Sequence, residues 1–115
     1  MAENLKQNSD FLSLLLLNDK TEKIQICAIL ETINSSQLHT ICVILSNIIK
    51  DNSPLNNRQR NILKKNKHLI RRILNKKTSK IKKYNIISRN SYQVYNLLKL
   101  STDLIKDILS KYVTH

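Results

Sequence analysis

The sequence predicts an all-α fold, a small helical bundle of about five to seven short helices without a β-sheet. Three observations support this prediction. Apolar residues recur at three- and four-residue steps along most of the chain. No stretch sustains the alternation of apolar and polar residues that marks a half-buried strand. The chain has 115 residues, which is enough for a single domain with a modest core.

The first segment, residues 1–53, is apolar and carries more acids than bases. Residues 10–17 are predicted to form a short apolar helix capped by Ser9 or Asp10. A second helix is predicted over about 20–33.

The third predicted helix, over 36–50, has the clearest pattern. The segment Asn34-Ser35-Ser36 ends the preceding helix and caps this one. The helix ends before Pro54, the only proline in the chain. Its apolar stripe consists of Leu38, Ile41, Cys42, Leu45, Ile48 and Ile49.

The second segment, residues 54–90, is basic. Asn56 and Gln59 resemble a capping box that opens an amphipathic helix over 57–75. Its predicted inner residues are Ile62, Leu63, Leu69, Ile70, Ile73 and Leu74.

Another basic helix is predicted to begin at Thr78 or Ser79 and to continue through Ile87, with a linker over 88–91. Its predicted inner residues are Ile81, Tyr84 and Ile87.

The third segment, residues 91–115, contains predicted closing helices over 92–100 and 102–113. The last helix repeats apolar residues at four-residue steps, which suits packing on the bundle or on a second copy in a homodimer. All three segments belong to one predicted domain.

Glycine is absent, whereas asparagine occurs fourteen times. The absence excludes glycine-rich phosphate loops, dinucleotide-binding turns and nucleophile elbows. Asparagine tolerates the left-handed conformation better than other non-glycine residues, so we expect asparagine at helix ends.

Charge is distributed very unevenly. The net charge is +12, yet no acid lies between Asp51 and Asp103, an interval that holds fourteen of the twenty Lys and Arg residues. The residues of such a block cannot form ion pairs with one another, and their positive charges repel each other. A bound polyanion would lower this repulsion. We predict that it binds nucleic acid, most favourably double-stranded DNA, through the phosphates. The predicted binding residues are Arg58, Arg60, Lys64, Lys65, Lys67, Arg71, Arg72, Lys76, Lys77, Lys80, Lys82 and Lys83.

Several alternatives remain open for this block. It could be a solvated face, a nuclear-import signal or a dock for an acidic protein surface. A helix-turn-helix regulator is less favoured, because Lys outnumbers Arg eight to five between Arg58 and Arg89 and base reading favours the Arg fork. Membrane-surface binding by 57–75 is disfavoured because Trp is absent and the only Phe lies outside it. Base stacking is a minor possibility for Tyr84, Tyr92 and Tyr95.

No enzyme, metal site or cofactor is predicted. His39, His68 and His115 lack ligand spacing, and Cys27 and Cys42 match no zinc pattern. His39 beside either thiol would lack an orienting group and an oxyanion hole. The two thiols do not make a disulfide framework, and we predict no signal peptide. Both points favour a reducing, intracellular location.

The order of several short motifs resembles a known family. An apolar helix containing a Cys is followed by the motifs of residues 52–87, namely Asn52-Ser53-Pro54-Leu55, Gln59, Leu63-Lys64-Lys65, Leu69, Lys76-Lys77-Thr78-Ser79, Lys80, Lys82-Lys83 and Ile86-Ile87. Over roughly 14–87 this order resembles the small basic proteins of adintoviruses, Polinton/Maverick-type elements and invertebrate genomes.

The resemblance implies a virus-like core protein of the virion or host nucleus, likened to adenovirus minor core proteins that neutralise packaged DNA. The matching bases are Lys64, Lys65, Lys76, Lys77, Lys80, Lys82 and Lys83. The chain departs from the family after residue 87, where Ser88-Arg89-Asn90-Ser91 and glycine-free helices replace a Gly-Gly-containing apolar tail.

Overall fold

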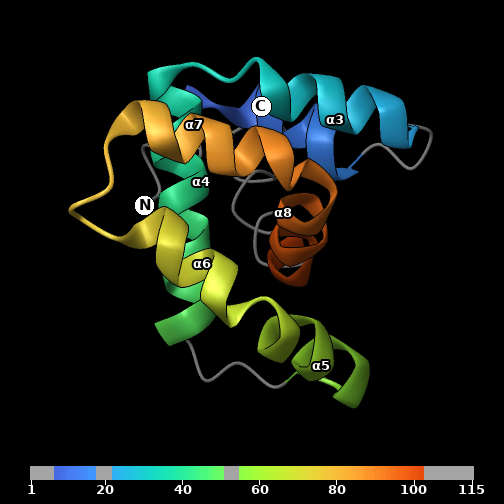
Figure 1. The fold of residues 1–115 in the computed structure, drawn as a ribbon. Coiled ribbons are helices and arrows are strands. Elements are labelled where there is room, and N and C mark those ends of the chain that lie inside the picture. The colour runs from blue at the N-terminus through green and yellow to red at the C-terminus, as the bar shows by residue number, and fades with distance from the viewer. Residues whose placement is uncertain (1–6, 18–21, 51–54, 103–115) are drawn as a thin grey trace.

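The computed structural model describes residues 7–17, 22–50 and 55–102 (Figure 1). These residues form helices and turns and contain no strand, which confirms the all-α prediction. The α-helices are α2 (Ser9–Leu12), α3 (Lys23–Glu31), α4 (Ser35–Lys50), α5 (Asn57–Lys65), α6 (Lys67–Leu74), α7 (Lys80–Arg89) and α8 (Ser91–Leu98). A π-helical turn, η1 (Ser13–Leu17), follows α2, and a 3-10 turn, η2 (Lys99–Ser101), follows α8.

The N-terminal helix begins as predicted but is capped differently. Asn8, not Ser9 or Asp10, holds the N-cap position of α2, and its side chain caps nothing there. The buried Asn8 amide instead donates to the Thr40 hydroxyl at 2.8 Å and to the Ser36 hydroxyl at 3.2 Å. These bonds to α4 satisfy a polar group that burial would otherwise penalise.

Helix α4 matches its prediction closely. The Asn34 side chain accepts from the Gln37 backbone N–H at 2.8 Å, and the Gln37 side chain accepts from the Asn34 N–H at 2.9 Å. Four residues of the predicted stripe are buried, while Cys42 is half-buried and Ile49 is exposed. Ile44, which the stripe omitted, is also buried, because neighbouring helices cover more than one face of α4.

The prediction of a single helix over 57–75 is wrong, because two helices meet at Asn66. Its backbone lies at φ −110° and ψ 9°, outside the helical region. The Asn66 amide donates to the Ile62 carbonyl at 2.8 Å, and its backbone carbonyl accepts from the Ile70 N–H at 3.0 Å. Asn66 therefore closes α5 and opens α6, since its side chain adds a second donor to the Ile62 carbonyl, which also accepts from the Asn66 backbone N–H at 3.2 Å.

The linker predicted over 88–91 is also wrong. Helix α7 continues to Arg89, and α8 begins at Ser91, with only Asn90 between them. The Asn90 amide donates to the Ile86 carbonyl at 2.8 Å, as Asn66 does to Ile62. Asparagine thus closes both helices, but at φ −110° and −122° instead of the expected left-handed conformation, and no described residue has a positive φ.

Helix α8 lies at the centre of the bundle and contacts α3, α4, α5 and α7 (Figure 1). Val94, Leu97 and Leu98 of this helix are fully buried. They join one core cluster with buried residues of every other described α-helix except α5. The predicted helix over 102–113, with its dimer surface, falls outside the described residues apart from Thr102.

The capping box of α5 provides a local test of this structure. The Asn56 side chain accepts from the Gln59 N–H at 2.8 Å, as predicted from the sequence. We expect Asn56→Ala to lower the free energy of unfolding by about 1 kcal/mol, because the Gln59 N–H loses its side-chain acceptor. Urea unfolding at constant m-value measures the change. The control is Asn57→Ala, one residue later and exposed, and an equal loss in both variants would contradict the capping role.

Candidate nucleic-acid interface

The predicted binding residues lie on the outside of the bundle. Eleven of the twelve side chains are exposed, and Lys83 is half-buried. They belong to α5, α6, α7 and the loop of residues 75–79. The exposed residues are Arg58, Arg60, Lys64, Lys65, Lys67, Arg71, Arg72, Lys76, Lys77, Lys80 and Lys82.

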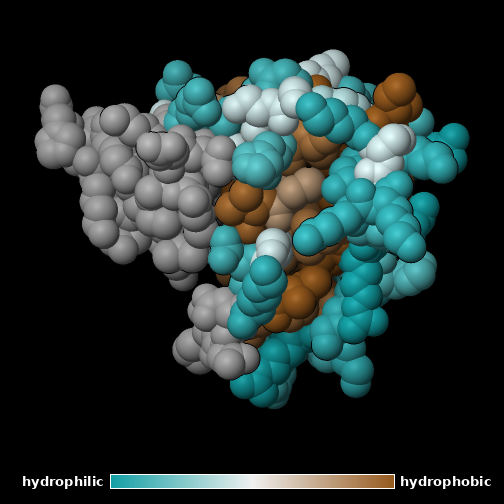
Figure 2. All heavy atoms as spheres, turned by 90° about the vertical axis from the view of Figure 1, so that its left-hand side faces the viewer, coloured by the Kyte–Doolittle hydropathy of each residue, from teal (hydrophilic) through white to brown (hydrophobic). Residues whose placement is uncertain are grey.

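Apolar side chains on the same helices fix these cations in place. Ile70 and Ile73 of α6 are fully buried, so Arg71 and Arg72 between them face outward. Helix α5 buries no residue completely, and its Ile62 and Leu63 pack on the rim of the core. Figure 2 views the molecule from the left of Figure 1 and shows hydrophilic side chains bordering a strip of hydrophobic ones.

Helices α5, α6 and α7 themselves carry no acid. The only carboxylates in the described ranges are Asp10, Glu22 and Glu31, all before α4. No ion pair joins any two of the described residues. The positive charge is therefore uncompensated within this part of the molecule, and a bound anion would lower its self-repulsion.

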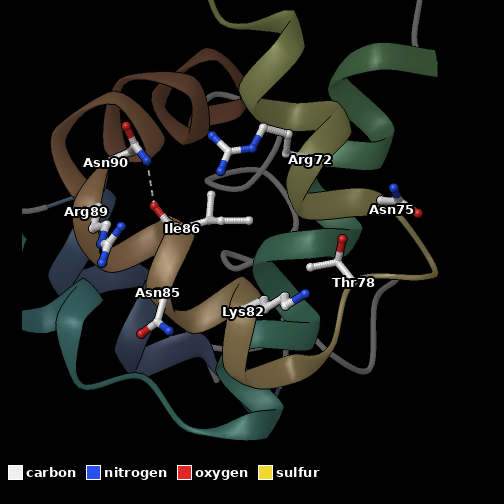
Figure 3. A pocket seen from close by; sticks show the side chains of 8 residues that line it. All are labelled: Arg72, Asn75, Thr78, Lys82, Asn85, Ile86, Arg89 and Asn90. Carbon is white, nitrogen blue, oxygen red and sulfur yellow. Dashed lines mark hydrogen bonds between the residues drawn. The ribbon is translucent and has the colours of Figure 1, made fainter.

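The tertiary structure brings cations of α6 and α7 together around one cavity of about 590 Å³. We call it the α6–α7 groove; Arg72 of α6 and Lys82 of α7 line it, together with Arg89 (Figure 3). Its other lining residues are Asn75, Thr78, Asn85, Ile86 and Asn90.

Arg89 is not among the predicted binding residues, because residues 88–91 are predicted to form a linker. Arg89 instead ends α7, two turns after Lys82 and on the same face of the helix. The sequence contains a pattern that could have identified Arg89, the seven-residue step from Lys82 to Arg89. A continuous helix places these two residues on the same face, two turns apart, with Asn85 and Ile86 between them.

A second cavity, of about 710 Å³, lies between the start of α4 and the start of α7. Lys80 and Lys83 line it, and the Lys80 ammonium donates to the Ser35 hydroxyl at 2.9 Å. His39 and Cys42 line the same cavity. Burial raises the pKa of the Cys42 thiol, and the positive charge of Lys83 opposes this only in part, so the thiol stays protonated near neutral pH.

Two of the three tyrosines considered for base stacking, Tyr92 and Tyr95, make ring contacts within the protein. Tyr95 is buried, and its ring lies 6.0 Å from the ring of Tyr92. The Lys23 ammonium lies 4.4 Å from the centre of the Tyr92 ring, and the Lys99 ammonium 5.1 Å from that of Tyr95. Stacking of a base on Tyr92 would have to displace Lys23 from this cation–π contact.

Residues 7–17, 22–50 and 55–102 contain neither a membrane-spanning helix nor a metal-binding cluster. No helix there has the length and hydrophobicity needed to cross a bilayer. No group of three or more His, Cys, Asp or Glu side chains there is arranged to hold a metal ion.

Comparison with protein-family models, with curated proteins and with solved structures gave no match to this chain.

Proposed function

We propose that this protein binds and condenses double-stranded DNA without reading its sequence, by neutralising phosphates. The observation that carries the proposal is the set of eleven exposed cations on α5, α6, α7 and the loop of residues 75–79, with no acid on these helices or this loop and with all three helices packed on one core. Because these cations lie on folded helices, their backbone needs little further ordering on binding. Each phosphate contact also releases condensed counterions.

The composition of this surface favours phosphate contact over base reading. Eight of the thirteen bases between Arg58 and Arg89 are Lys, which meets phosphate as a point charge. A major-groove reader presents a few side chains on one face of a single helix. Here the bases are spread over three helices and a loop, and the break at Asn66 divides the first basic stretch.

The setting that we propose is a virus-like core or packaging role in the virion or host nucleus. It rests on the resemblance of the motif order to the small basic proteins of adintoviruses and Polinton/Maverick-type elements. We propose no catalytic activity for His39 and Cys42, which line the same cavity. Burial keeps the Cys42 thiol protonated, and no group among the described residues is seen to orient the pair for nucleophilic attack. The alternative is a structural protein that docks an acidic protein surface.

Binding to random duplex DNA is expected to depend strongly on salt. If about six phosphates are neutralised, log K should fall with log[salt] at a slope of about −5. A fluorescence-anisotropy titration between 50 and 300 mM NaCl measures the slope. A slope shallower than about −2, or strong preference for one duplex over random sequence, would contradict the packaging function.

The same titration should include duplex RNA, heparin and an acidic peptide. Tighter binding to duplex DNA than to heparin supports a nucleic-acid ligand. Binding to the acidic peptide alone, with no DNA shift at 50 mM NaCl, would favour the structural alternative.

A further inference from the structure

We propose that the α6–α7 groove is a preformed docking site for phosphate groups, in which Arg72 and Arg89 hold the phosphate oxygens from opposite walls. The proposal identifies one place on the basic surface where binding is concentrated. It rests on the proposed function only for the source of the phosphate, the backbone of a nucleic acid.

The groove supplies donors of the type that a phosphate requires. Two of its three cations are Arg, whose planar fork can donate two parallel hydrogen bonds to one phosphate. Figure 3 shows Arg72 reaching from α6 toward Asn90, at the end of α7 where Arg89 also lies. None of the cations is paired with a carboxylate in the described residues, so their charge is available to a ligand.

Neutral donors add to the cations. The Asn85 amide and the Thr78 hydroxyl line the groove and make no hydrogen bond to another described residue. Both can donate to a phosphate oxygen. Polar groups that line a hollow and have no partner among the described residues can fix a ligand's orientation there.

The two ends of the groove are held by helix caps. Asn75, after α6, accepts from the Lys77 N–H at 3.0 Å, and Asn90, after α7, donates to the Ile86 carbonyl at 2.8 Å (Figure 3). The half-buried Ile86 packs against the core. These bonds and contacts join residues of the groove to the rest of the protein, so little ordering remains to be done on binding.

The dimensions fit more than one phosphate. Lys82 and Arg89 are seven residues apart on α7, which is about 10.5 Å along the helix axis. One strand of B-DNA rises about 3.4 Å along the duplex axis per phosphate, but it winds around that axis, so its successive phosphates lie about 7 Å apart and a strand lying along α7 would present about two of them to this length. The volume of about 590 Å³ would also admit a free chain of three phosphates.

The decisive variant is Arg72→Gln with Arg89→Gln. The matched control is Arg58→Gln with Arg60→Gln, which removes the same charge from exposed positions on α5. At 150 mM NaCl, we expect the groove variant to bind random duplex at least 10-fold more weakly than the control variant. Circular dichroism and thermal unfolding verify that both variants are folded. The variant Arg72→Lys with Arg89→Lys keeps the charge but loses the planar guanidinium groups. Its affinity for random duplex should lie between those of the groove variant and the native protein.

A second arm uses tripolyphosphate, which carries phosphate without a nucleic acid. NMR titration should shift the side-chain amide signals of Asn85 and Asn90 in the native protein and in the control variant, and not in the groove variant. Tripolyphosphate binding at the groove without duplex binding would refute the proposed function and leave the groove assignment in place.

Two outcomes would overturn the groove assignment. Equal loss of duplex binding in the groove and control variants would show a uniform basic surface, while the proposed function would stand. Amide shifts with an acidic peptide that match those with tripolyphosphate at equal charge would show a general anion site without preference for phosphate.

Discussion

Reversing Lys76, Lys77 and Lys82 to Glu is expected to remove most of the binding to DNA, on every sequence alike. The three side chains are exposed, lying on the loop after α6 and on α7. Each reversal replaces an attractive contact by a repulsive one. At 150 mM NaCl we expect affinity for random duplex to fall about 100-fold or more, and the salt slope to fall from about −5 to about −2. Lys83 is left unchanged because a carboxylate at its half-buried position would also disturb folding.

The matched control reverses Lys23, Lys50 and Lys99, which are exposed and lie outside the predicted binding residues. Each reversal changes the charge by −2, so three reversals take both variants from +12 to +6. The control should keep binding within about 10-fold of the native protein, since only long-range attraction is reduced. Equal loss in the two variants would mean that net charge, and not a basic surface on α6 and α7, accounts for binding.

Leu97→Ala in α8 is expected to cause a large loss of stability. Leu97 has no exposed surface, and its helix contacts α3, α4, α5 and α7. Truncation loses the transfer free energy of the removed atoms and leaves a cavity, which together cost about 3 kcal/mol. This is a large part of the stability of about 5–15 kcal/mol that a domain has. The midpoint temperature of thermal unfolding should fall by about 10 °C.

The control for this substitution is Ile24→Ala on α3. Ile24 is 80% exposed, so its truncation should change the free energy of unfolding by less than about 0.5 kcal/mol. Urea unfolding of both variants measures the difference. A loss below about 1 kcal/mol for Leu97→Ala would contradict a central position for α8.

Features that depend on neighbours in sequence could be predicted. The reciprocal bonds of Asn56 with Gln59 are confirmed, as is the N-cap at Ser79, whose hydroxyl accepts from the Lys82 N–H at 3.3 Å. Both arise within a single helical turn, so the residue types at that spacing are sufficient. The outward position of Arg71 and Arg72 likewise follows from the apolar residues beside them on α6.

Helix boundaries at asparagine could be predicted only in part. The residue type at the ends of α5 and α7 was expected, because the chain has no glycine. The position was not, since fourteen asparagines offer many possible breaks, and among the described residues two helices meet at a single asparagine at Asn66 and at Asn90. Packing energy, shared among distant segments, selects these two breaks.

The sequence alone therefore determined an all-α chain whose cations face outward on an apolar frame, because helical periodicity and charge are local properties. The tertiary structure decided which cations meet. It placed Arg72 of α6 across a groove from Lys82 and Arg89 of α7, and it put α8 in the middle of the bundle. Those arrangements depend on how separate helices share one core, which no window of neighbouring residues records.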